Sequence, residues 1–149
     1  DSIQGQTAGT NRYVVQVVAD SANADTQVTT SSYTDIGLSA SITPSSANNK
    51  ILITVHLSTI AKFGGDTSLS ARLLRDSTSV IVFEGLAGDN GGTGSNAVGG
   101  SGTTFLDSPA TTSSVTYKVQ IINNTGNGTV RVHQSAASDS TMTLMEIAQ

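Results

Sequence analysis

The chain has no cysteine, no tryptophan and few charged residues, and each absence narrows what it can be. Lysine, arginine, aspartate and glutamate together make up 12% of the 149 residues, about half the usual share. Without cysteine, the chain has neither disulfide bonds nor a thiolate metal site. No apolar run approaches the ~18 residues of a membrane-spanning helix, so we expect no membrane insertion. The formal net charge of −4 argues against nucleic acid as a partner, because phosphate-binding proteins present a basic face.

Serine and threonine replace the missing charged residues, with 21 copies of each. This composition is not typical of disorder, which combines low hydrophobicity with a high net charge. Threonine, valine and isoleucine all favour β-strands. The length fits one domain. We expect a single β-sandwich domain over residues 12–149, preceded by an N-terminal extension or linker over residues 1–11.

Alternation of apolar and polar residues dominates the chain, and no stretch keeps a helical period over three turns. Many short alternating segments, separated by Gly, Ser, Asn and Pro, predict an all-β sandwich or barrel. The predicted strands cover residues 12–18, 27–31, 34–42, 50–60, 69–75, 80–84, 103–106, 114–122, 129–134 and 141–147. The predicted core includes Val55, Leu57, Leu73, Val119 and Ile121.

Residues 85–102, GLAGDNGGTGSNAVGGSG, interrupt the alternation, because eight of these 18 residues are glycine. We expect a long loop that is either a tolerated surface insertion or a functional segment. Glycine loses much backbone entropy on ordering, so such a loop is held by contacts from outside itself or not held at all. The candidate receptor or partner contacts in this loop are Asp89, Asn90, Thr93, Ser95 and Asn96. Because the loop offers a single carboxylate, too few for calcium, we expect no metal and no cofactor.

Two predicted strands are apolar on both faces. Leu52 and Ile60 oppose the main apolar face of residues 50–60, and Met145 and Ile147 oppose that of residues 141–147. A two-layered monomer keeps one face of each sheet polar, so these residues need a cover from another part of the chain or from another copy. The low charge favours another copy. The predicted oligomer interface therefore contains Leu52, Ile60, Met145 and Ile147.

Groups that could carry out catalysis are few and scattered. His56 and His133 occur on different predicted strands, each on the polar side, and a metal site would require them to converge. The sequence has no Gly-x-Ser-x-Gly nucleophile motif. A glycosidase needs paired carboxylates, and the sequence leaves open whether Glu84 and Glu146 face each other. We predict a non-enzymatic protein without catalytic residues, and a glycan-active enzyme is the weaker alternative.

Four segments occur together in a characteristic order. The stretch YTDIGLSASITPSSANNKILITVHLS is followed by ARLLRDSTSV, FLDSPATTSSVTYKVQ and STMTLMEIA. In this combination the chain resembles, from about Arg12 to Gln149, a virion-surface β domain common in phages of marine and cyanobacterial hosts. That domain typically forms the C-terminal part of tail-fibre-like or capsid-attached proteins. The resemblance implies a jelly-roll or TNF-like antiparallel β-sandwich that forms a homotrimer on the virion surface, and it transfers no catalytic motif.

The resemblance implies a structural role and leaves two functions open. The first is a trimeric phage fibre knob that joins a fibre stalk and binds a host-surface glycan or protein as its receptor. The second is a capsid decoration (cement) protein that stabilises the head through contacts with other virion proteins. A fibre normally has a long stalk, whereas only DSIQGQTAGTN precedes the first predicted strand. We expect either a domain separated from its stalk or a short stand-alone surface protein.

Overall fold

A computed structural model of the chain describes residues 12–133 and 138–149, and within these ranges every regular element is a β-strand. The described residues contain no helix that is long and apolar enough to cross a membrane. In chain order the strands are β1 (Val14–Ala22), β2 (Thr26–Val28), β3 (Thr34–Ile42), β4 (Lys50–Phe63), β5 (Leu69–Arg75), β6 (Thr78–Ala87), β7 (Asn96–Asp107), β8 (Val115–Asn123), β9 (Thr129–Val132) and β10 (Ser140–Ile147).

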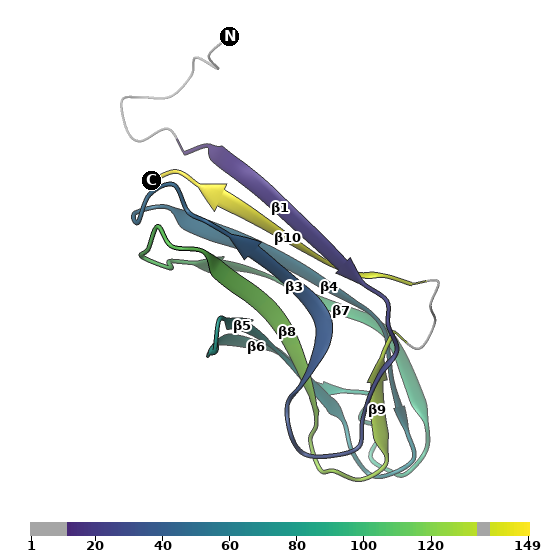
Figure 1. Cartoon of the computed structure of the whole chain (residues 1–149). Helices are drawn as coiled ribbons and strands as arrows, with labels where there is room; N and C mark the ends of the chain where they lie inside the picture. The colour runs from purple at the N-terminus through teal and green to yellow at the C-terminus, as the bar shows by residue number, and fades with distance from the viewer. Residues whose placement is uncertain (1–11, 134–137) are drawn as a thin grey trace.

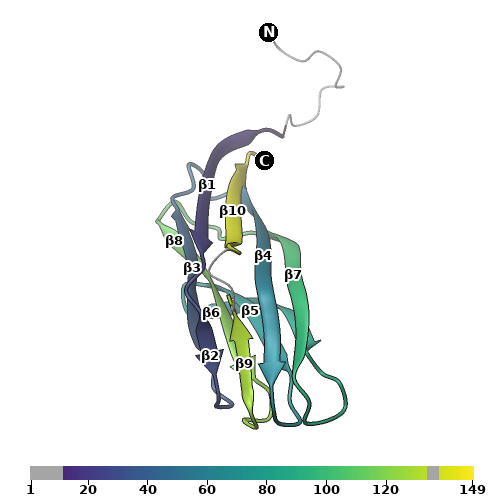
Figure 2. The same cartoon turned by 90° about the vertical axis from the view of Figure 1, so that its right-hand side faces the viewer.

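The strands form two antiparallel sheets packed face to face (Figure 1). The first, which we call the β4 sheet, has the order β1-β10-β4-β7, and the short strands β9 and β2 extend it beside the last residues of β4. Figure 2 views this sheet from its outer side. The second, the β8 sheet, has the order β3-β8-β5-β6. All-β sandwich architecture, as predicted, is therefore confirmed.

The pairing pattern identifies the sandwich as a jelly roll. With β2 and β9 set aside, eight strands remain, and the first pairs with the last, the second with the seventh, the third with the sixth and the fourth with the fifth. This is the pairing of one long antiparallel hairpin rolled over itself into two four-stranded sheets, which is the jelly-roll arrangement.

Period-2 alternation places the core between the two sheets. In β8, every second residue from Val115 to Asn123 is buried and the intervening ones are half-buried. The five predicted core residues are all confirmed, with exposed fractions of 2% or less; they are Val55, Leu57, Leu73, Val119 and Ile121. The faces of β5, of β8 and of β4 as far as Leu57 were therefore assigned in the correct register.

The prediction of a long loop over residues 85–102 is wrong. Strand β6 continues to Ala87 and β7 begins at Asn96, so only residues 88–95 form a loop. The glycines that suggested a loop are needed where β7 pairs with β4. A Cβ on Gly102 would lie 2.5 Å from the backbone oxygen of Val55, and one on Gly100 would lie 2.8 Å from that of Leu57. Glycine here permits a close approach of two backbones within a sheet.

The assignment of Ile60 to an exposed second face is also wrong. The register between β4 and β7 shifts on both sides of Ile60, and Thr59 has a φ of 49°. Such a β-bulge inserts a residue and reverses which face the following side chains occupy. Ile60 is consequently 0% exposed within its own chain and is excluded from contact with another copy.

The sandwich has two distinct ends. At the end that we call proximal, Val14 pairs with Ile147, so the described chain starts and finishes there. Strand β4 begins at this end and is about 45 Å long, given its 14 residues. At its other, distal end, Lys62 pairs with Asn96, which follows the loop of residues 88–95. The expected extension over residues 1–11, like the predicted strand end at Gln134, lies outside the described residues.

Candidate functional site

The loop of residues 88–95, which we call the distal loop, carries four of the five predicted contact residues. Asp89, Asn90, Thr93 and Ser95 are exposed, whereas Asn96 is half-buried and belongs to β7. The loop lies at the end of the sandwich opposite to the chain termini. Its exposed side chains therefore present carboxylate, amide and hydroxyl groups to solvent far from the proximal end.

Lys62, near the end of β4, contacts the distal loop and stabilises it. Its side chain is 0% exposed, and its Nζ donates a 2.6 Å hydrogen bond to the carbonyl oxygen of Gly92. Gly88 packs on the same side chain, since a Cβ at this glycine would lie 3.3 Å from Cβ of Lys62. The loop is thus held by a contact from outside itself, which is one of the two predicted alternatives. Lys62 gave no signal in the sequence, because a lysine near the end of an alternating strand is normally solvent-exposed.

Hydrogen bonds between neighbouring residues of the distal loop also stabilise its conformation. Asp89 Oδ1 accepts from the backbone N–H of Gly91 at 2.9 Å, and Asn90 Nδ2 donates to the Gly94 carbonyl at 3.2 Å. The single carboxylate of the loop is therefore engaged with its own backbone. Among residues 12–133 and 138–149, no group of three or more His, Asp or Glu side chains is arranged to hold a metal ion.

The outer face of the β4 sheet carries a row of apolar side chains across four strands. Val17 of β1 pairs with Met145 of β10, Met145 with Leu52 of β4, and Leu52 with Leu106 of β7. A second, shorter row pairs Val14 with Ile147. We call these six residues the apolar band: Val14, Val17, Leu52, Leu106, Met145 and Ile147.

The apolar band includes three of the four residues predicted for an oligomer interface. Leu52, Met145 and Ile147 are half-buried in the single chain. The members that sequence reasoning missed are more exposed, at 56% for Val17 and 46% for Leu106. They escaped notice because each looked like the ordinary apolar residue of its own strand. Only the pairing of strands far apart in the sequence places them in one row.

The apolar band ends toward the middle of the sheet. The next row along the strands pairs Ala19 with Thr143, Thr143 with Thr54, and Thr54 with Thr104. Small and hydroxyl-bearing side chains thus replace large apolar ones, and an open depression lies over β1 and β10 at this level. The apolar band is therefore confined to the proximal half of the sheet, and Val98 of β7, 44% exposed, is a separate apolar residue near the distal end.

The two histidines do not form a site. His56 is exposed on the outer face of β4, where it pairs with Thr141. His133 is 0% exposed, although its strand position had suggested the polar side, and its Nε2 lies 2.7 Å from Oγ of Ser140. Because Ser140 and Thr141 are neighbours on β10, their side chains point to opposite faces of the sheet. The histidines are thus separated by the sheet itself.

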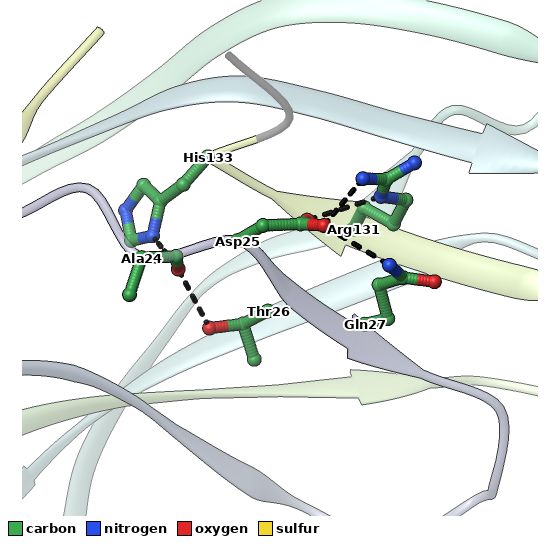
Figure 3. Close-up of polar contacts among 6 residues, drawn as sticks. All are labelled: Ala24, Asp25, Thr26, Gln27, Arg131 and His133. Carbon is green, nitrogen blue, oxygen red and sulfur yellow. Dashed lines mark hydrogen bonds and ion pairs between the residues drawn. The ribbon is translucent and has the colours of Figure 1, made fainter. Parts of the chain in front are cut away.

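Figure 3 shows His133 beside the segment that connects β1 to β2. Its Nδ1 donates to the carbonyl oxygen of Ala24 at 2.9 Å, since a carbonyl oxygen can only accept. Next to it, Arg131 of β9 forms an ion pair with Asp25, and Gln27 Nε2 donates to the same carboxylate at 3.0 Å. The hydrogen bond from Arg131 holds the pKa of Asp25 below its ordinary value. These contacts fasten β2 to β9, which is a structural role.

The carboxylates Glu84 and Glu146 do not face each other, because they lie on different sheets with separate partners. Glu84 of β6 accepts from backbone N–H groups of Gly85 and Leu86 and from Oγ of Ser101. Glu146 of β10 is 0% exposed and accepts from four donors at 2.6–2.8 Å. The pair required for a glycosidase is therefore not assembled from these two residues.

Glu146 instead fastens the turn between β3 and β4 to the sheet. Asn49 Nδ2 and Gln16 Nε2 each donate to it at 2.6 Å, and both the backbone N–H and the hydroxyl of Ser45 donate at 2.7–2.8 Å. Burial raises the pKa of Glu146, but the hydrogen bonds from Asn49, Gln16 and Ser45 outweigh it and lower the pKa to about 2. A carboxylate this well satisfied stays ionised at neutral pH and stabilises the proximal end.

Comparison with solved structures shows weak likeness to two virus structures. One is a structure of infectious bursal disease virus, Gx strain, with a TM-score of 0.46, 14% identity, and coverage of 93% of this chain and 40% of the other. The second is the VP2 subviral particle of the same virus, with a TM-score of 0.41, 14% identity, and coverage of 91% and 39%. This chain therefore spans about 40% of the length of either neighbour. No protein-family model and no curated protein matches the chain.

Proposed function

We propose that this chain is a virion structural domain, most specifically the trimeric knob of a phage fibre. One observation carries the proposal: the apolar band and the exposed distal loop lie at opposite ends of the same rigid sandwich. One end is suited to assembly and the other to recognition. The sequence resemblance to phage virion-surface β domains supports the virion as the location.

The apolar band supports assembly of several copies. Its two rows expose large apolar side chains, among them Val14 at 48% and Val17 at 56%. Contiguous apolar patches of this kind on a folded protein mark interaction sites. We propose a homotrimer in which Leu52, Met145 and Ile147 become buried between copies. Ile60 is not part of this proposal, since it belongs to the core of its own chain.

The distal loop supports recognition of a host-surface glycan or protein. Asp89, Asn90, Thr93 and Ser95 offer both donors and acceptors of hydrogen bonds, and none of them is aromatic or large and apolar. Such a polar loop binds weakly at each site, because its hydrogen bonds only replace those with water. A trimer presents three loops on one particle and so recovers affinity through multivalency.

The knob assignment is tested by a loop variant that preserves the fold. Thr93→Ala and Ser95→Ala are combined, while Asp89 and Asn90 keep their hydrogen bonds within the loop and Gly88 and Gly92 keep their contacts with Lys62. We expect the variant to assemble like the parent and to lose most of its binding to host cells. The matched control combines Thr29→Ala and Thr30→Ala, two exposed positions between β2 and β3. Unchanged cell binding, together with heat-fragile particles, would contradict the knob and favour decoration.

A capsid decoration protein is the second candidate function. The observation that favours it is that the apolar band lies at the proximal end, beside the first and last described strands. A decoration protein needs such a surface to attach to the capsid and to its neighbours. An image of the virion decides between the two, because a knob lies at the tip of a fibre and a decoration protein lies on the head.

A further inference from the structure

We propose that copies of this chain associate head to tail, with the β1 edge of one copy against the β7 edge of the next, in a closed ring of three. This inference rests on the proposed assembly and names the surfaces that carry it. Both edges belong to the same sheet, and both carry members of the apolar band: Val14 and Val17 on β1, and Leu106 on β7.

The two edges are the open sides of the β4 sheet. Within residues 12–133 and 138–149, β1 pairs with β10 alone and β7 pairs with β4 alone. These strands are long, with nine and 12 residues. An exposed, long and apolar edge strand is a template for pairing with another chain.

Neither edge carries the outward charges that normally protect such strands. Asp20 is the charged residue of β1, and its Oδ2 accepts from the backbone N–H of Ser39 on the opposite sheet. Asp107 is the charged residue of β7; it is buried and bonded to Arg75 and to the hydroxyl of Tyr117. Both carboxylates are thus turned away from the edges, which leaves the edges open to pairing.

The presence of two such edges favours a ring over a dimer. A two-fold dimer uses the same patch on both copies. It would therefore cover β1 or β7 and leave the other edge exposed. A head-to-tail contact uses both edges of every copy once, and it closes when the rotation between copies completes a circle. The second copy is therefore the partner that satisfies both edges.

Turning the β4 sheets toward the centre of the ring also covers the middle of the apolar band. Leu52 and Met145 lie on the two inner strands of the sheet, and they would meet their equivalents across the three-fold axis. The members of the band on the two edge strands are the most exposed, at 48% for Val14, 56% for Val17 and 46% for Leu106, and an apolar patch of this kind marks an interaction site. Stable interfaces need roughly 800 Å² per partner, so in this arrangement the edge strands and the hydroxyl rows beside the band would be buried together with it.

Cysteine crosslinking tests the arrangement, because the chain has no cysteine of its own. Three versions of the full chain are prepared: Val17→Cys, Leu106→Cys and the double variant. Each is treated with a mild oxidant and, separately, with a short bismaleimide that tolerates a wider separation. We expect each single variant to remain uncrosslinked and an equal mixture of the two to give a covalent dimer. The double variant should give covalent dimer and trimer.

A matched control pairs Val17→Cys with Val82→Cys, which is 55% exposed but lies on β6 of the other sheet. We expect no crosslinked trimer from this control. A covalent dimer from Val17→Cys alone would show a two-fold contact through β1 and would overturn the inference. Trimers in light scattering without crosslinks by either reagent would overturn the inference but leave the proposed assembly standing. A monomer in light scattering would overturn both.

Discussion

The outer faces of the two sheets differ in the side chains that they expose to solvent. On the β8 sheet, polar side chains from neighbouring strands bond to one another. Asp35 of β3 accepts from Lys118 Nζ at 3.0 Å and from Gln120 Nε2 at 2.7 Å, both on β8. Arg72 of β5 donates to the same Gln120 at 2.6 and 3.0 Å and stacks 3.6 Å above the ring of Tyr33.

On the β4 sheet, the equivalent positions of the proximal half hold the apolar band, which has no polar group to bond. Cross-strand pairs stabilise a sheet in both cases, but only the bonded polar side chains of the β8 sheet, which we call the polar ladder, can also form hydrogen bonds with water. The difference indicates that the outer face of the β8 sheet is suited to solvent and that the proximal half of the β4 sheet is suited to a partner. Val82 and Leu86 of β6, 55% and 67% exposed, are apolar exceptions on the β8 sheet.

The strongest test of this comparison places a charge on each face in turn. Leu52→Asp should disrupt the assembly, because an unpaired charge buried between copies costs roughly 3–5 kcal/mol, or at least about 100-fold in association. Val82→Asp, at an exposed apolar position of β6 beside Arg72, should leave the assembly unchanged. Light scattering at micromolar concentration should return the 15.1 kDa monomer only for Leu52→Asp. An assembled Leu52→Asp variant would show that the band is not an interface.

The core beneath the polar ladder should be far more sensitive than the ladder itself. Val119 and Ile121 are 0% exposed, and they flank the outward-facing Gln120 on the same strand. Val119→Ala and Ile121→Ala should each lower the free energy of unfolding by roughly 1–4 kcal/mol, through lost apolar transfer and the cavity left behind. Gln120→Ala should cost less than about 1 kcal/mol. Chemical denaturation measures all three, and equal losses at positions 119–121 would contradict the alternation of faces.

Acid should lower the free energy of unfolding by protonating Glu146, which lies at the proximal end of the sandwich. The folded pKa of Glu146, about 2, is below the ordinary value of 4.5. The folded state therefore binds its proton more weakly than the unfolded state. The stabilisation is complete above pH 4.5 and is lost as the pH falls from there toward 2. Its full size is about 3 kcal/mol for a shift of this magnitude.

The variant Glu146→Gln isolates this contribution. It should be less stable than the parent at pH 7 and should lose much of the parent's pH dependence between pH 4.5 and 2, as measured by urea denaturation. Asp35→Asn on the polar face is the matched control. Burial raises the pKa of Asp35, but hydrogen bonds from Lys118 and Gln120 lower it overall. Because Asp35 is exposed, its variant should change the pH dependence less than Glu146→Gln does.

The smallest effect is expected at Arg72. Arg72→Ala removes the stacking on Tyr33 and two hydrogen bonds to Gln120. Exposed interactions of this kind contribute less than about 1 kcal/mol each, so the melting temperature should fall by only a few degrees. The assembly should not change. A loss of trimers in Arg72→Ala would place a contact on the polar face and reverse the comparison between the two sheets.

Much of the fold could be predicted because alternation is a local signal. The bounds of β3 and β5 match the predicted residues 34–42 and 69–75. Part of the candidate site was predictable for the same reason. Leu52, Met145 and Ile147 lie on the outer face as their positions in the alternation require, and four of the five loop residues are exposed. Whether these residues contact another copy or a receptor stays a prediction.

By itself, the sequence determined which segments alternate, and hence the all-β class and the core face wherever the alternation is unbroken. The tertiary structure alone decided three further features. The glycines of β7 became a strand because the backbone of β4 lies against them, and the bulge at Thr59 moved Ile60 into the core. Lys62 was buried by a loop that folds back over it. Each depends on a backbone contact between residues far apart in the chain, and no local pattern of side chains encodes where that distant backbone will lie.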